Sequence, residues 1–226
     1  MHRPHPCGWS LASLPVLVLA CVLFAFPGSS SANSYWYPLS AGTHWIYSDG
    51  TVTLTVEVGN QQIRAGQNVH AVSYVLTGLV TNQPTAWTWY TMIDDDGIVR
   101  HVGCRPESSN AWYEFAPAWA WLKLPPAEGD TWGEADLMMV THHGKDSSPG
   151  SGWYQYSWDQ SGTVTTPAGR FTGCHSSHGW VAPMVGQVTF RLPPAYLHPG
   201  ELLLVESSLV VPASDRSWSA LKERFR

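Results

Sequence analysis

Polar and apolar residues alternate along much of the chain, most clearly over Thr51–Val58 (TVTLTVEV). Alternation with a period of two is typical of a β-strand with one face on a core and the other in water. The segment His44–Ser48 (HWIYS) precedes it, and the intervening Asp49-Gly50 suits a tight hairpin because these residues accept positive φ angles. This hairpin predicts one shared, buried face that is formed by Trp45, Tyr47, Val52, Leu54 and Val56.

The strand pattern continues through the first half of the chain. Segments rich in β-branched and aromatic residues lie at 69–80, 85–93 and 98–102, with turn signals at 59–60, 82–84 and 94–97. Short turns between consecutive strands predict an antiparallel meander of five strands over roughly Thr43–Val102. The acidic run Asp94-Asp95-Asp96 before Gly97 lacks the spacing and the closing Glu of a calcium-binding EF-hand, so we interpret it as a hairpin turn.

The second half of the chain is less regular. The segment Arg105–Asp130 combines prolines with a cluster of large aromatic residues, and we interpret it as a long packed loop with at most one short strand or helical turn. Further strands are expected at 137–141, 153–158, 163–166, 186–192 and 202–211, a loop at 142–152, and a short helix at 215–226. The predicted fold class is therefore all-β: one strongly curved antiparallel sheet, a sandwich or an open barrel, with long loops.

Composition narrows the class of protein. Only 13% of the residues are charged, against about 25% in an average globular domain, and 13 are tryptophan. Disordered chains have few aromatic residues and high charge, so a folded chain is indicated. The formal charge of −5 does not favour nucleic acid as a partner. No linker or repeat divides the chain, which predicts one β-rich domain over 33–226.

The first 32 residues have the features of a secretory signal peptide. The apolar run Leu11–Phe26 is followed by small residues, and Ser30 and Ala32 fit a cleavage site before Asn33. A membrane anchor is one alternative, although the run is shorter than the roughly 20 residues that span a bilayer. A lipoprotein signal that ends at Cys21 is another, although the apolar residues after Cys21 argue against it. We expect a periplasmic or extracellular protein without a membrane span after cleavage.

Cleavage would leave two cysteines, Cys104 and Cys174, in the exported chain. Two cysteines in an oxidising compartment predict one disulfide. Such a bond would close a loop of about 70 residues and stabilise the fold by about 3–4 kcal/mol. Free thiols or metal ligands are the alternatives.

Four blocks of sequence carry a family resemblance. They are 37–47 (YPLSAGTHWIY), 122–132 (LKLPPAEGDTW), 164–174 (VTTPAGRFTGC) and 180–188 (WVAPMVGQV). In this order they resemble the motifs (F/Y)PLxxGxxWxY, LxLPxxxGDxW, VxTPAGxFxxC and WxAPxVGxV of a loose group of uncharacterised secreted bacterial β proteins and lipoproteins. The resemblance implies a β-rich fold of the export compartment with no established chemistry. The chain departs from the motif at 174–178 (CHSSH), where an apolar continuation is usual, so the strand expected after the cysteine is either absent or short.

Two sets of side chains are candidates for a site. His142, His143, His175 and His178 could join a cysteine in binding copper or zinc, because imidazole and thiolate suit both ions. Their spacing matches no standard zinc module, and solvated loop histidines are the alternative. Trp87 and Trp89 lie on one face of a predicted strand and could stack on a ligand, with ordinary core packing as the alternative.

Known catalytic motifs are absent from the sequence. There is no Gly-x-Ser-x-Gly elbow, no His-Glu-x-x-His, no phosphate loop and no dinucleotide fingerprint. The leading hypothesis is an exported, non-catalytic β domain without a cofactor, which binds an envelope partner or a small apolar or glycan ligand, or has a structural role in the envelope. The alternatives are an envelope metal-binding protein that uses Cys and His, and then an enzyme that acts on glycans.

Overall fold

The computed structural model describes residues 35–81, 83, 85–108, 112–134, 138–141, 147–148 and 154–209. The expected signal segment, the pair His142 and His143, and the expected helix at 215–226 lie outside these residues. Within them the chain is all-β, apart from one turn of 3₁₀ helix, η1 (Pro194–Tyr196). The all-β prediction is therefore confirmed.

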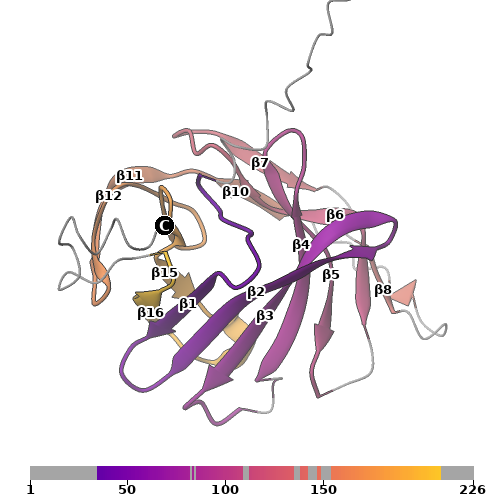
Figure 1. Ribbon diagram of the computed structural model, residues 1–226, viewed down its shortest axis with the longest axis horizontal. Helices are drawn as coiled ribbons and strands as arrows, with labels where there is room; N and C mark the ends of the chain where they lie inside the picture. The colour runs from indigo at the N-terminus through magenta and orange to yellow at the C-terminus, as the bar shows by residue number, and fades with distance from the viewer. Residues whose placement is uncertain are drawn as a thin grey trace, which may run out of the picture.

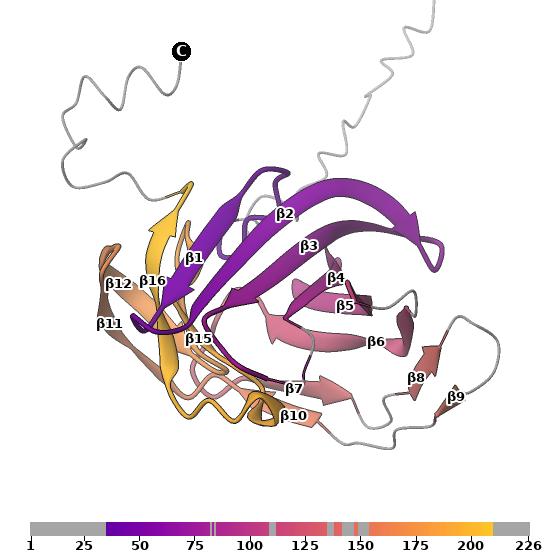
Figure 2. The same ribbon diagram turned by 90° about the horizontal axis from the view of Figure 1, so that it is seen from below.

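One large antiparallel sheet dominates the structure and curls into an open half-barrel (Figures 1 and 2). Its ten strands, in spatial order, are β15 (Thr189–Arg191), β16 (Glu201–Ser207), β1 (His44–Ser48), β2 (Thr53–Arg64), β3 (Gln67–Thr77), β4 (Ala86–Ile93), β5 (Ile98–Pro106), β6 (Tyr113–Lys123), β8 (Met138–Thr141) and β9 (Ser147–Ser148).

Two small antiparallel sheets complete the fold. A four-stranded sheet is formed by β11 (Gln160–Thr166), β12 (Gly169–Ser176), β13 (Trp180–Ala182) and β14 (Gly186–Gln187). A two-stranded sheet is formed by β7 (Thr131–Glu134) and β10 (Tyr154–Ser157). In Figure 2, β7 and β10 lie across the open side of the half-barrel from β1 and β2.

Strands β1 to β5 form the predicted meander, because each pairs with the next in antiparallel register. The first hairpin turns at Asp49-Gly50 as expected: Asp49 Oδ1 accepts hydrogen bonds from the backbone N–H groups of Thr51 and Val52, both at 2.8 Å, and Gly50 has φ of 91°. The predicted turn at Gly59-Asn60 is wrong. Here β2 continues through a bulge, and a Cβ on Gly59 would lie 2.9 Å from the backbone oxygen of Ala71 on β3.

The predicted long loop at 105–130 is also wrong, because most of it is strand. Strand β5 extends to Pro106, and β6 has 11 residues. Proline cannot donate to a ladder and occurs in sheets mainly at irregularities. Pro117 fits this rule, since the register between β5 and β6 shifts between the pairs His101↔Trp119 and Gly103↔Glu114.

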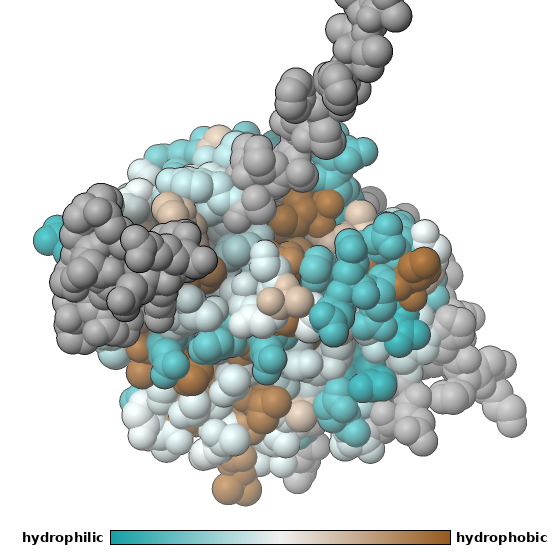
Figure 3. Space-filling model, in the orientation of Figure 1, coloured by the Kyte–Doolittle hydropathy of each residue, from teal (hydrophilic) through white to brown (hydrophobic). Residues whose placement is uncertain are grey.

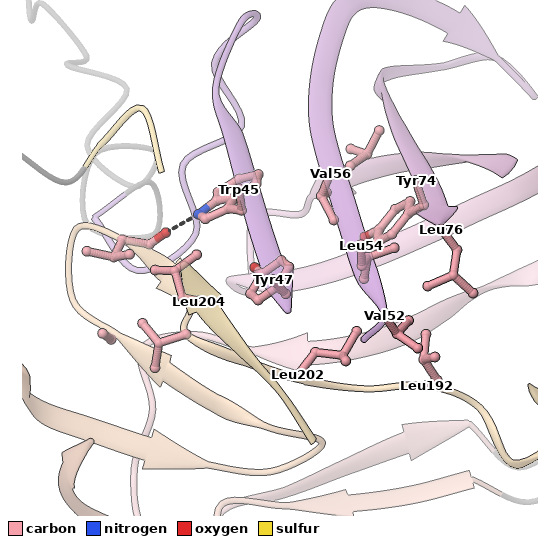
Figure 4. Packing of buried hydrophobic residues seen from close by; sticks show 14 of the residues in the cluster. Trp45, Tyr47, Val52, Leu54, Val56, Tyr74, Leu76, Leu192, Leu202 and Leu204 are labelled. Carbon is pink, nitrogen blue, oxygen red and sulfur yellow. Dashed lines mark hydrogen bonds between the residues drawn. The ribbon is translucent and has the colours of Figure 1, made fainter. Parts of the chain in front are cut away.

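The main core lies inside the half-barrel, between β1–β3, β16 and the four-stranded sheet (Figure 4). The five residues expected on one face, Trp45, Tyr47, Val52, Leu54 and Val56, are all buried in it. Trp45 Nε1 donates a hydrogen bond to the backbone oxygen of Val185 at 2.6 Å, and Tyr47 donates one to that of Gln187 at 3.0 Å. Both bonds satisfy buried polar groups and tie β1 to a segment 140 residues further along the chain.

A candidate ligand cavity inside the curved sheet

A cavity of about 630 Å³ lies inside the half-barrel beside the main core. Strands β3 to β6 form one wall, and β10, β14, β15 and η1 contribute to the opposite wall. Cavities that bind small molecules typically measure about 300–1,000 Å³ and have largely apolar walls. This cavity meets both criteria, since most of its surface is apolar.

Strand register places a row of aromatic rings on the first wall. Tyr74 of β3 pairs with Trp87 of β4, and Trp89 of β4 pairs with Cys104 of β5. Alternate residues of a strand point to the same face, so the two tryptophans share a face as the sequence predicts, and both line the cavity. The rings of Tyr74 and Trp87 stack with centroids 5.6 Å apart and planes inclined by 6°.

His101 of β5 lies among three tryptophans on this wall. Its ring centroid is 4.6 Å from that of Trp89, 5.4 Å from that of Trp119 and 5.1 Å from that of Trp121. Its Nδ1 is 2.9 Å from the Thr91 hydroxyl oxygen. Burial lowers the pKa of His101 to about 3, so the imidazole is uncharged at neutral pH. The histidine therefore adds a polar edge to the wall without adding a charge.

The opposite wall is also aromatic, and its residues come from distant parts of the sequence. Tyr156 of β10 accepts a hydrogen bond from Trp119 Nε1 at 3.1 Å. Phe190 of β15 contacts Tyr74, and Tyr196 of η1 contacts Trp87, with ring centroids 6.1 and 5.7 Å apart. These ring contacts across the interior join the two walls into one cavity.

The polar side chains of the cavity include Ser177 and Gln187, but its charged groups are few. None of its described lining residues is Asp or Glu, and one, Arg191, carries a permanent charge. His178 also lines the cavity and packs edge-on against Tyr156, with ring centroids 4.1 Å apart. Burial lowers the pKa of His178, an effect that Asp159 partly opposes. Glycosidases use paired carboxylates, which these lining residues do not provide.

The predicted disulfide between Cys104 and Cys174 is not formed in the structure, where both residues are free thiols. The reason is that they serve different parts of the fold. Cys104 lies on β5 and lines the cavity, whereas Cys174 lies on β12 in the main core, where its Sγ donates to the backbone oxygen of Phe171 at 3.3 Å. Burial raises the pKa of both thiols, to about 12 for Cys104.

The histidines proposed as metal ligands do not form a centre within the described part of the chain. There, no three His, Cys, Asp or Glu side chains are close enough together to hold a metal ion. His175 packs edge-on against Trp36 and Trp158, with ring centroids 5.6 and 6.1 Å apart, and His178 faces the cavity. The acidic turn is a hairpin, in which Asp94 accepts hydrogen bonds from the Ile98 N–H and the Arg100 guanidinium.

The sequence predicts Trp87 and Trp89 as ligand-stacking residues, and Cys104 and His178, which were candidates for a disulfide and a metal site, also line the cavity. Most of the other lining residues were missed. Trp119 and Trp121 were assigned to a loop, although their alternation with Ala120 and Leu122 has the period of a strand. His101 is not among the candidate histidines of the sequence. No local signal identifies Tyr196, because its contact with Trp87 depends on how the chain returns across the sheet.

Comparison of the chain with protein-family models, curated proteins and solved structures found no match. Among the described residues, no helix is long and apolar enough to cross a membrane. The function is therefore inferred from the cavity and its lining.

Proposed function

We propose that this protein binds a small, largely apolar molecule in the cavity of the half-barrel. The observation that carries the proposal is the cavity of about 630 Å³, which is walled by tryptophan, tyrosine and phenylalanine rings. Rigid aromatic rings bind flat or flexible apolar molecules with little loss of side-chain entropy. A ligand that buries about 200 Å² of apolar surface gains roughly 5 kcal/mol from the hydrophobic effect.

An apolar ligand fits better than a glycan. A sugar presents many hydroxyl groups, and burying each of them without a hydrogen bond costs free energy. Polar atoms form the smaller part of this cavity's surface, and ring faces are abundant. On the face of the molecule shown in Figure 3, hydrophobic side chains form small, separate patches among polar ones, which supports recognition inside the cavity rather than on that face.

Binding can be tested with the uncharged fluorophore N-phenyl-1-naphthylamine, whose emission rises in apolar surroundings. We expect saturable binding at about micromolar concentration, with quenching of tryptophan emission by energy transfer. Trp89→Ala should weaken binding about tenfold, because the Trp89 ring forms part of the cavity wall.

Trp112→Ala is the matched control for this experiment. Trp112 packs against Tyr90 and Arg64 in a separate cluster with Val69 and Val102, and it does not line the cavity. Its truncation should leave probe affinity unchanged. Absence of saturable binding by the unmodified protein, or equal loss in the two variants, would reject the proposal.

We further propose that binding takes place outside the cytoplasm. The N-terminal apolar run and the small residues before Asn33 support export. N-terminal sequencing of the protein from the producing cell should find Asn33 as the first residue. A lipid-modified product that begins at Cys21 would replace this proposal with membrane anchoring.

A further inference from the structure

We infer that the cavity's ligand is an amphiphile, with an apolar body among the tryptophans and an anionic head group at Arg191. This inference rests on the proposed function and specifies the chemistry of its ligand. The position of charge around the cavity supports it. Arg191 is the one permanently charged residue among the described lining residues, and its side chain is 72% exposed. The positive charge therefore lies at the entrance, whereas the buried part of the wall around His101 is uncharged.

Arg191 retains capacity to bind an anion. Its Nε forms an ion pair with Oε1 of Glu201 at 3.6 Å, a distance beyond hydrogen-bond length. That Glu201 oxygen instead accepts a hydrogen bond from the Thr189 hydroxyl at 2.7 Å. A guanidinium can bind a carboxylate through two parallel N–H groups, which adds geometric selectivity to the charge interaction.

A cationic head group fits the same entrance poorly. Tryptophan faces attract cations, but the imidazole of His101 already occupies the space among Trp89, Trp119 and Trp121. No described lining residue offers a carboxylate to pair with a cation. An ammonium beside the Arg191 guanidinium would be repelled by its like charge. The same geometry attracts a carboxylate.

Three probes with one apolar body separate the head group from the body: 1-pyrenebutyrate, 1-pyrenebutanol and 1-pyrenebutylamine. Their dissociation constants are measured by quenching of tryptophan emission at pH 7.5 and low salt. We expect the carboxylate to bind about five- to tenfold more tightly than the alcohol, and the amine to bind most weakly. The preference should shrink as salt is added, because the head group lies near solvent.

Two variants with the same change in net charge locate the effect. Arg191→Gln should abolish the preference for the carboxylate and leave the affinity for 1-pyrenebutanol unchanged. Arg170→Gln, on the exposed face of β12, should preserve the preference, because Arg170 does not line the cavity. Since Arg191 is largely exposed, its replacement should also leave the unfolding midpoint unchanged.

The outcomes distinguish this inference from the proposed function. Equal binding of the three probes, or equal loss of preference in both arginine variants, would overturn the anionic head group while the cavity remains a binding site. Tighter binding of the amine would likewise overturn it. Failure of all three probes, the alcohol included, would instead count against the proposed function itself.

Discussion

Around β1–β3 and β16 the interior of the half-barrel is filled, whereas beside β3–β6 it encloses a cavity next to a second, smaller core at the ends of β5 and β6. The filled region consists mainly of Val and Leu side chains from the large sheet, packed against residues of the four-stranded sheet. The hollow region has tryptophan and tyrosine walls. The same curved sheet thus supplies a core at one end and a site at the other.

Side-chain shape differs between the main core and the cavity wall. Branched aliphatic side chains interdigitate until few voids remain, which is the usual density of a protein interior. The large rings of the cavity wall pack edge-to-face or in stacks, and the space between the two walls is left unfilled. The stability of the protein should therefore depend mainly on the filled region, and ligand affinity on the hollow one.

The largest expected effect is on the filled side. Trp45→Ala should lower the free energy of unfolding by about 3–5 kcal/mol, because it leaves a void and removes the hydrogen bond to the Val185 backbone oxygen. Urea denaturation measures this, with the half-buried Trp112→Ala as the reference. An equal loss in the free energy of unfolding would mean that Trp45 stabilises the fold no more than a half-buried tryptophan does.

The two cysteines allow one substitution to be compared in both regions. Cys174→Phe should cost about 1–3 kcal/mol or more, because the dense core around β12 has no space for a ring. Cys104→Phe should change stability by less than about 1 kcal/mol, because its ring can enter the cavity, and it should weaken binding of N-phenyl-1-naphthylamine. Equal destabilisation of the two variants would mean that the cavity is not open space in solution.

Acid should destabilise the hollow region through His101. Its folded-state pKa is about 3 and its ordinary value is 6.5, so the unfolded chain binds a proton more readily. The stabilisation from the neutral imidazole is complete above pH 6.5 and decreases by about 1.4 kcal/mol per pH unit below it, down to pH 3. Between pH 7.5 and 5.0, His101→Phe should therefore lose about 2 kcal/mol less than the unmodified protein in urea titrations. An identical pH dependence of both proteins would contradict a buried neutral histidine.

The smallest effect is on thiol chemistry and leaves the fold intact. The thiolate is the reactive form of cysteine, so a pKa of about 12 for Cys104 predicts slow alkylation of the native protein at pH 8. Bound N-phenyl-1-naphthylamine should slow the reaction of Cys104 further, because that thiol lines the cavity, and should leave the rate at Cys174 unchanged. When the protein is unfolded without reduction and then alkylated, peptide mapping should find both Cys104 and Cys174 alkylated. A disulfide-linked pair of peptides would instead support the predicted disulfide.

Local sequence features predicted the hairpin of β1 and β2 well and the hollow region poorly. Alternation and the Asp49-Gly50 dipeptide are local signals, and they placed the inward face of both strands. The Gly59 bulge was predicted as a turn, because the sequence alone does not distinguish two roles of glycine. Glycine is favoured where a neighbouring strand approaches closely, as at Gly59, and also where the chain reverses direction. Prolines concealed β6 for a similar reason, since Pro117 lies at a break in register.

The cavity was harder to foresee because its two walls are far apart in sequence. Trp87 and Trp89 share a face by simple alternation, which is why they were candidates. Whether such rings face a packed core or a cavity depends on which later segment of the chain lies opposite them. In this protein that segment carries Phe190 and Tyr196. Long-range packing of this kind has no local signature, so charge and composition could suggest a ligand only in general terms.

The pairing of β1 with β16 also determines when the sheet can be completed during folding. His44 hydrogen-bonds to a residue 164 positions later, so β1 cannot complete its ladder until β16 has been synthesised. Contacts of such high sequence separation slow folding, because a long loop must close before they form. A nascent chain would therefore expose the unpaired edge of β1 throughout synthesis, and loss of the segment from Glu201 onward would leave that edge open to other chains.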